Sequence, residues 1–241
     1  MRIWICFLLV LPLGLGSCRY MMGKRVRGNG VIRTEEHSVS SFKNVDVSGT
    51  INLYISQGDQ KPVRLEGDEN LLRLIEVVEE GDRLIVREMP GYNLDPTGDL
   101  RVYVTAPEFS HIRVSGAGDI VGQNKIVNNE ALFLHSSGAG DIKMNVDAPE
   151  LTAQISGSGS IDLQGQTKDV DLGLSGAGSA HCYDLLAENT RVEISGAGSA
   201  EVYASVKLEA RVSGAGSVSY KGNATTVEQH VSGVGSVNKV N

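Results

Sequence analysis

Apolar and polar residues alternate with a period of two through long stretches of the chain after residue 30, and this pattern predicts β-strands. The stretch "VDVSGTINLYIS" places apolar side chains at Val45, Val47, Ile51, Leu53 and Ile55. The stretches "RLIVRE" and "DLRVYVTAP" alternate in the same way, and the turn signals "EGD" and "DPTGD" precede them. Because successive side chains of a strand point to opposite faces, each strand should bury one face and expose the other. The helical candidate is Asp68 to Glu80, where we expect one or two helical turns that lead into a strand.

A motif of the form SGxG recurs seven times in the second half of the chain and sets its organisation. Its serines are Ser115, Ser137, Ser156, Ser175, Ser195, Ser213 and Ser232, with spacings of 22, 19, 19, 20, 18 and 19. Counted from each serine, positions −5, −3, −1, +5 and +7 are mainly apolar, whereas −4 and −2 are mainly polar. Columns that stay in register over seven copies favour stacked coils rather than a meander of hairpins. We therefore predict an all-β fold, a β-solenoid with coils of about 19–20 residues.

The SGxG motif is interpreted as the corner of each coil, because glycine adopts positive φ freely and lets neighbouring coils approach closely. A phosphate-binding loop would need a lysine and a following helix, and no copy has them. Calcium-binding β-rolls repeat an aspartate in every copy, but here the +4 place holds Asp119 and Asp141 in two copies and serine in the other five. We interpret both aspartates as structural turn residues. A metal site and a carboxylate pair for glycoside hydrolysis remain weaker alternatives for them.

The first residues have the composition of a lipoprotein signal peptide. Arg2 is followed by an apolar run, Ile3 to Leu15, which is too short for a transmembrane helix and ends in "LGSC". Small residues directly before Cys18 resemble the bacterial lipobox, so we predict a signal peptide over residues 1–17 and lipidation of Cys18. Residues 18–30 have no periodicity and are predicted to be a tether.

Cysteine and charge content exclude several classes of function. Once Cys6 leaves with the signal peptide and Cys18 carries lipid, Cys182 is the one remaining thiol, so no intramolecular disulfide can form. Cys182 falls in an apolar column and is expected to be a core residue. A net charge of −7 without a basic stripe argues against nucleic acid as a partner. The five histidines show no metal-ligand spacing, and His111, His135, His181 and His230 fall in outward columns. We expect no metal and no cofactor.

Three segments together resemble a known family. They are "FKNVDVSGTINLYISQGDQKPVRLEGDENLL", then "LRVYVTAPEFSHIRVSGAGDI", and then the serial "SGAGS" repeats. This combination resembles the head GIN domain family of exported bacterial proteins, many of them lipoproteins of Bacteroidetes, which are named as auto-transporter adhesins. The resemblance implies a right-handed β-helix with an N-terminal β region over residues 31–110 and an SGxG solenoid over residues 111–241. It supplies no catalytic residues.

We accordingly predict a lipid-anchored, non-enzymatic binding module of the cell envelope, an adhesin at the outer membrane. Its expected partners are the membrane, through the lipid, and a glycan or protein ligand whose binding residues are unknown. Surface-exported lipoproteins of Bacteroidetes often carry acidic residues just after the lipidated cysteine, whereas Arg19, Tyr20 and Met21 follow it here, so the membrane face stays open. The alternatives are a structural envelope lipoprotein and a carbohydrate-active enzyme centred on Asp119 and Asp141. The segment from Arg87 to Asp99 is a candidate recognition loop.

Overall fold

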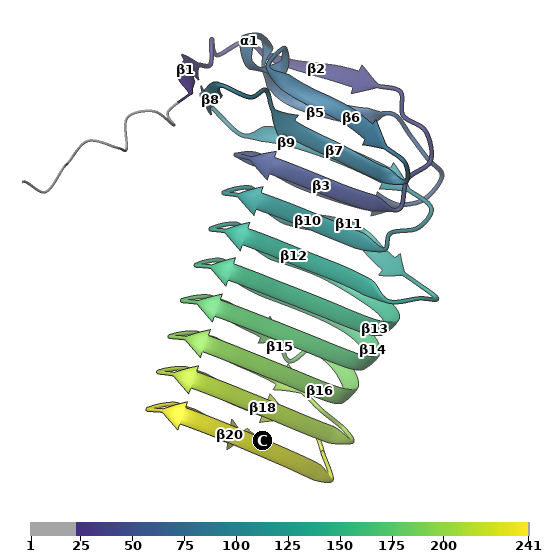
Figure 1. The fold of residues 1–241 in the computed structure, drawn as a ribbon. Helices are drawn as coiled ribbons and strands as arrows, with labels where there is room; N and C mark the ends of the chain where they lie inside the picture. The colour runs from purple at the N-terminus through teal and green to yellow at the C-terminus, as the bar shows by residue number, and fades with distance from the viewer. Residues whose placement is uncertain (1–22, 241) are drawn as a thin grey trace, which may run out of the picture.

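Parallel pairing from one coil to the next organises the chain over residues 23–240, which are the residues that the computed structural model describes. The result is a long stack of coils, with the N-terminal region at one end and the C-terminal coil at the other (Figure 1). The predicted signal peptide and the lipidation site Cys18 lie outside the described residues, so both stay predictions. The β-solenoid itself is confirmed.

Each coil of the repeat region contributes one strand before the SGxG corner and one strand after it. The strands that lead into a corner are β10 (His111–Gly116), β12 (Leu132–Gly138), the last part of β13 (Ile142–Gly157), the last part of β14 (Ser160–Gly176), β16 (Leu185–Gly196), β18 (Lys207–Gly214) and β20 (Thr226–Gly233). The strands that leave a corner are β11 (Ile120–Val127), the first parts of β13 and β14, β15 (Ser179–Cys182), β17 (Ser199–Tyr203), β19 (Ser217–Lys221) and β21 (Ser236–Lys239). All these pairings are parallel, and they place the motif serines opposite one another from coil to coil.

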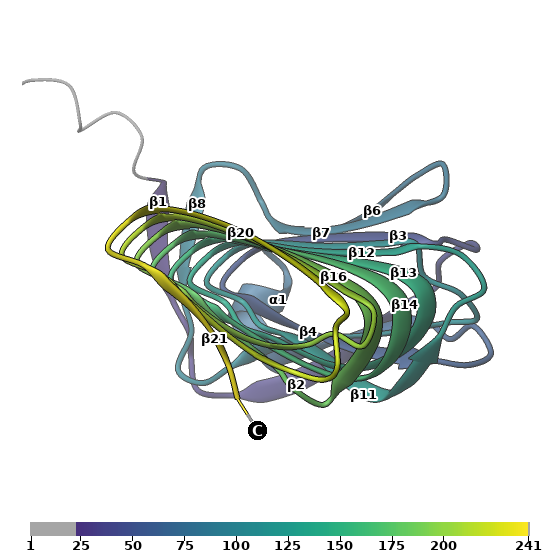
Figure 2. The same ribbon diagram turned by 90° about the horizontal axis from the view of Figure 1, so that it is seen from below.

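Viewed along the stack, the coils have a flattened outline with two long faces (Figure 2). The SGxG corner closes one side of this outline, and the chain bends more gently around the other side. Strands β13 and β14 run without interruption from one corner around this gentler bend to the next corner, which accounts for their 16 and 17 residues.

The period-two columns of the sequence become the core between the two faces. Leu172 is fully buried and Val170 and Leu174 nearly so, whereas Asp171 between them is on the outside. Cys182 is 1% exposed, which confirms that it is a core residue. Because like residues stack on like residues, each coil covers the apolar positions of its neighbours.

The N-terminal region continues the stack and then closes it. Strands β3 (Asn44–Gly49) and β4 (Ile51–Gln57) form one more coil against β10 and β11. Beyond this coil, β7 (Arg83–Glu88) pairs with β3 and β9 (Leu100–Ala106) pairs with β4, both in parallel. The outermost strands are antiparallel: β6 (Ile75–Glu80) against β7, β5 (Val63–Asp68) against β9, and β2 (Ile32–His37) against β5.

A short helix, α1 (Glu69–Leu72), covers the end of the core at this N-terminal end. Its buried residues Leu71 and Leu72 have no more than 1% exposure, and Figure 2 shows α1 inside the outline of the coils. The prediction of a helical turn followed by a strand between Asp68 and Glu80 is confirmed by α1 and β6.

Two predictions about the N-terminal region need correction. Within the predicted tether, β1 (Lys24–Arg27) pairs in parallel with β8 (Tyr92–Asp95), so residues 24–27 belong to the folded body. The candidate recognition loop, residues 87–99, contains β8 and directs Leu94 into the core at 3% exposure. Leu94 and the partly buried Tyr92 therefore serve packing, because β1 holds β8 against the body.

The C-terminal coil has no neighbour beyond it within the described residues. Val227 and Val231 of β20 occupy core columns, yet they are 36% and 43% exposed. The residues one coil earlier in the same columns, Leu208 and Val212, are 0% and 2% exposed. The two ends of the described stack therefore differ, since one is covered by α1 and the other is open.

Candidate functional site

The SGxG corner is a structural device in which the two glycines have different roles. The first glycine of every copy has positive φ, from 115° at Gly176 to 140° at Gly157, a region that other residues rarely adopt. The second glycine of each copy does not have positive φ. A Cβ at either glycine would collide with the preceding coil, for example at Gly138 with the Gly116 carbonyl oxygen and at Gly140 with the Gly118 carbonyl oxygen.

The corner groups also bond to one another along the stack. The Ala139 N–H donates to the Gly116 carbonyl oxygen at 3.0 Å, and the Ala197 N–H donates to that of Gly176 at 2.8 Å. The second glycine acts likewise, since the Ser199 N–H donates to the Gly178 carbonyl oxygen at 3.2 Å. Because these carbonyl oxygens already accept hydrogen bonds from the next coil, the corners offer a ligand little beyond their serine hydroxyls.

An eighth corner, which the seven copies of the motif do not predict, precedes them in the chain. Ser48 and Gly49 pair with Ser115 and Gly116, Gly49 has a φ of 103°, and its carbonyl oxygen accepts the Ala117 N–H. The signal was the fragment "VSG" at residues 47–49. The repeat period does not predict this corner, because 67 residues separate it from the next copy and the second half of the motif is absent.

The aspartates in the +4 place bond to the coil that follows them. The Asp119 carboxylate accepts the Asp141 N–H at 2.9 Å, and the Asp141 carboxylate accepts both the N–H and the hydroxyl of Ser160, at 2.7 and 2.8 Å. Asn52 serves the same purpose one coil earlier, where it accepts the Asp119 N–H. This arrangement gives the two carboxylates a structural role in the stack.

Other candidate chemistry is sparse within residues 23–240. No group of three or more His, Cys, Asp or Glu side chains there has an arrangement that could hold a metal ion. Burial raises the pKa of the Cys182 thiol to about 12, so it stays protonated at neutral pH. No helix in this part of the chain is long and apolar enough to span a membrane.

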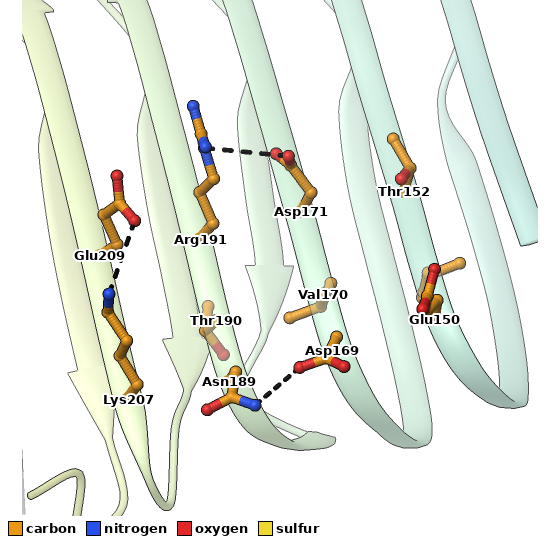
Figure 3. A pocket seen from close by; sticks show the side chains of 11 residues that line it. Glu150, Thr152, Asp169, Val170, Asp171, Asn189, Thr190, Arg191, Lys207 and Glu209 are labelled. Carbon is orange, nitrogen blue, oxygen red and sulfur yellow. Dashed lines mark hydrogen bonds and ion pairs between the residues drawn. The ribbon is translucent and has the colours of Figure 1, made fainter. Parts of the chain in front are cut away.

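A polar hollow lies on the outer face of the strands that lead into the corners, near the beginning of those strands (Figure 3). It has a volume of about 340 Å³ and spans β13, β14, β16 and β18. Because residues in register on parallel strands align, two rows of outward side chains cross these four strands. One row is Glu150, Asp169, Asn189 and Lys207, and the other is Thr152, Asp171, Arg191 and Glu209.

Asn189 of the first row and Arg191 of the second row differ in how tightly they pair. In the first, Asn189 donates to the Asp169 carboxylate at 2.6 Å. In the second, Arg191 lies 3.8 Å from both Asp171 and Glu193, which is too long for a hydrogen bond. Figure 3 shows Arg191 beside Asp171 with its guanidinium extending along the face. Its N–H groups are therefore open to an incoming acceptor.

The carboxyl of Asp171 sits in a mixed electrostatic setting. Partial burial raises its pKa, Arg191 opposes this shift, and the carboxylates of Glu193 and Glu209 add to it. The side chain is still 48% exposed, so a ligand can reach it. Arg191 and Asp171 together offer a donor and an acceptor on adjacent coils.

A second hollow of about 230 Å³ continues the first one toward the corners, and the two share Asp171. Gly173 lies at its centre, where the flanking strands carry Gln154 and Glu193 in the same row. The missing side chain at Gly173 thus deepens the face. In the sequence, Gly173 appears as a glycine in a column of polar residues. A period-two pattern shows that this position points outward, but it does not predict that the position lies within a groove.

An exposed aromatic pair extends the same face toward the N-terminal region. The Phe133 ring stacks on the His111 ring with centroids 4.5 Å apart, and Phe133 remains 38% exposed. In the row of outward residues, Phe133 is followed by Thr152, Asp171 and Arg191 on successive coils. At the spacing of neighbouring strands, these four positions extend over about 15 Å. We define the outer groove as Thr152, Asp171, Gly173 and Arg191 with the two hollows that they line, and Phe133 lies beside it on the preceding coil.

Comparison with known proteins links the chain to one family and one fold. A family profile described as "putative auto-transporter adhesin, head GIN domain" matches residues 41–224. No curated protein matches the chain. A crystal structure of a putative adhesin from Bacteroides fragilis superposes with a TM-score of 0.84 at 23% identity, over 89% of this chain and 100% of that one.

Two further crystal structures from the genus Parabacteroides share the fold. A putative lipid binding protein from P. distasonis has a TM-score of 0.75 at 22% identity, over 90% of this chain and 100% of its own. A putative adhesin from P. merdae has a TM-score of 0.69 at 23% identity with the same coverage. At such identities the likenesses show the solenoid fold.

Proposed function

Because this chain belongs to the head GIN domain family of adhesin-type proteins, we propose that it is a non-enzymatic binding module, held at the cell envelope by a lipid on Cys18. The signal-like residues 1–17 and the "LGSC" sequence support the export and the anchor. The solenoid then acts as a rigid scaffold whose outward side chains vary from coil to coil. The observation that carries the binding role is the outer groove, where open polar groups flank the gap at Gly173.

The groove suits an extended polar ligand, and we favour a glycan over a protein. Arg191 and Asp171 supply a donor and an acceptor for hydroxyl groups, and Thr152 can act as either. The exposed ring of Phe133 offers a flat apolar surface for the C–H face of a sugar ring. Successive coils are separated by about 4.8 Å, which is similar to the length of one sugar unit in an extended chain.

The first experiment tests binding to this groove. The chain starting at Arg19 is screened on arrays of glycans and matrix proteins, and affinities of the ligands found are then measured for variants. Arg191→Ala removes the open guanidinium, and Gly173→Gln fills the hollow, so each should weaken binding about tenfold or more. Ser219→Gln enlarges a side chain that projects outward from β19, a strand that takes no part in the groove, and serves as the control.

The outcomes separate the alternatives. Glycan binding that falls with Arg191→Ala and Gly173→Gln but not with Ser219→Gln supports the proposal. Equal affinities for all three variants would place the ligand elsewhere. If the groove bound only proteins, the proposal of a glycan ligand would give way to a protein ligand. A lack of any ligand would favour the structural envelope protein.

The enzymatic alternative has its own test. Because Asp119 and Asp141 accept hydrogen bonds from the following coil, changing both to Asn should alter neither ligand binding nor any activity toward polysaccharides. Reducing sugar released by the wild-type protein, but not by this double variant, would identify a carbohydrate-active enzyme.

A further inference from the structure

The C-terminal coil combines exposed core residues with an open backbone edge. The Thr226 N–H donates to the Val206 carbonyl oxygen, toward the preceding coil. Because backbone groups alternate in direction along a strand, Val227, Gln229 and Val231 direct their N–H and C=O groups away from β18. Within the described residues β20 has no neighbour on this side. An exposed strand edge of this kind pairs readily with another strand.

The residues of β20 are complementary to a second copy of the same strand. Consider an antiparallel pair about a two-fold axis at Gln229, so that Gln229 lies opposite its own copy. Val227 then lies opposite Val231, and Glu228 lies opposite His230. The open backbone groups fall in the hydrogen-bonded pairs, and Glu228 and His230 fall in the non-hydrogen-bonded pairs, where side chains are closer.

Gln229, the polar residue at the axis, can bond to its own copy in this arrangement. The column of Gln229 is otherwise apolar, with Leu134, Ala153, Leu172, Val192 and Ala210 on the preceding coils. A glutamine amide has both a donor and an acceptor, so two copies of Gln229 can hydrogen bond to each other. Outside the axis, Glu228 already binds Lys207 at 2.9 Å, and His230 of a second copy would place an imidazole N–H donor beside the same carboxylate.

We propose that two copies of this chain associate end to end through β20, with a two-fold axis at Gln229. The partner is a second copy because each half of the pairing matches the other in apolar, polar and amide positions. Association stops at two copies, since α1 covers the core at the other end and Leu71 and Leu72 are buried beneath it.

The pairing gives the binding module a partner on a facing membrane, and this consequence rests on the lipid anchor of the proposed function. Strand β1 lies at the opposite end of the stack from β20, as Figure 1 shows. In an end-to-end pair the two N-terminal ends therefore point away from each other. Two copies anchored through their N-termini would join two membranes rather than lie in one.

Sedimentation of the chain starting at Arg19 tests the association without the anchor. The wild-type protein should be a dimer at high concentration and dissociate on dilution. Gln229→Lys places two like charges at the axis and should raise the dissociation constant about tenfold or more. Because Gln229 is exposed, the monomers of the variant and of wild type should melt at the same temperature when both are measured below the dissociation constant. A monomer at every concentration, a polymer that grows without limit, or a Gln229→Lys dimer as tight as wild type would each overturn the proposal.

Charge exchange tests the register itself. The double variant Glu228→Lys/His230→Lys and the single variant His230→Glu each create like-charge pairs in their own dimers, so each alone should dimerise weakly. A mixture of the two variants restores opposite charges at every pair and should form heterodimers. Heterodimers no tighter than either homodimer would refute this register.

Beads that carry the protein through its N-terminal residue then test the facing geometry. Wild-type beads should cluster, and Gln229→Lys beads should stay dispersed. Dimers in solution without bead clustering would contradict the facing arrangement. Because neither assay includes the lipid or a glycan, failure of the anchor or of the outer groove would leave both results unchanged.

Discussion

Replacement of Leu172 by aspartate tests which side chains of β14 point into the core, and what a buried charge there costs in stability. Leu172 is fully buried, with Ala153 and Val192 at the paired positions on the adjacent coils. Loss of a buried leucine side chain costs about 2–5 kcal/mol of unfolding free energy. Burial also raises the pKa of a carboxyl by up to about 3–5 units, and each unit corresponds to about 1.36 kcal/mol. The sum is comparable with the whole stability of a typical domain, about 5–15 kcal/mol.

The pH dependence separates the charge from the lost packing. Since the folded pKa of the introduced carboxyl lies above its unfolded value of about 3.9, the charge penalty is absent below that pH. The penalty grows as the pH rises above the unfolded value and levels off above the folded pKa. Leu172→Asn has almost the same shape without the charge. The two variants should therefore be equally stable at low pH and diverge toward neutral pH.

Urea unfolding of both variants and of wild type, from low to neutral pH, measures the difference. Asp171→Asn is the matched control on the outer side of the same strand. Its ion pair with Arg191 is long and exposed, so its effect should stay within about 0.5 kcal/mol. Two outcomes would refute the assignment of Leu172 to the core and Asp171 to the outside. One is an equal loss of unfolding free energy for Leu172→Asp and Asp171→Asn, and the other is the same pH dependence for Leu172→Asp and Leu172→Asn.

Three further predictions concern the anchor, the corner and the buried thiol. Cys18→Ala should move the protein from the membrane fraction to the soluble fraction, and labelling of this variant by a fatty-acid analogue would contradict lipidation at Cys18. Gly157→Ala should lower the unfolding free energy by about 2 kcal/mol or more, because the new Cβ meets the Gly138 carbonyl oxygen and φ is +140°. Ala177→Ser changes the exposed middle residue of a corner and should be neutral; similar losses for both variants would count against the corner geometry. Cys182, with its pKa raised to about 12 by burial, should react with a thiol reagent at pH 8 only as the protein unfolds in urea, and rapid reaction of the native protein would show that the coil opens there.

The repeat region could be predicted from the sequence because its contacts are periodic. Each core residue, such as Leu172, meets the residue about 19 positions before or after it, so the same columns return in every coil. The alternation of period two then assigns each side chain to the core or to the outside. These two periods determined the solenoid, the burial of Cys182 and the outward direction of the histidines.

The ends of the stack and the outer groove were decided by tertiary structure. The closed N-terminal end of the stack depends on strand pairings that do not repeat along the sequence, such as β1 with β8 and the antiparallel β2 with β5. No repeated pattern of residues therefore predicts them. The eighth corner at Ser48 joins the stack across 67 residues for the same reason. Whether Gly173 is a gap in a binding face, and whether Val227 is core or open surface, depends on which strands lie beside them. A residue's own neighbours in the chain cannot fix that, because parallel pairing joins side chains that are far apart in sequence.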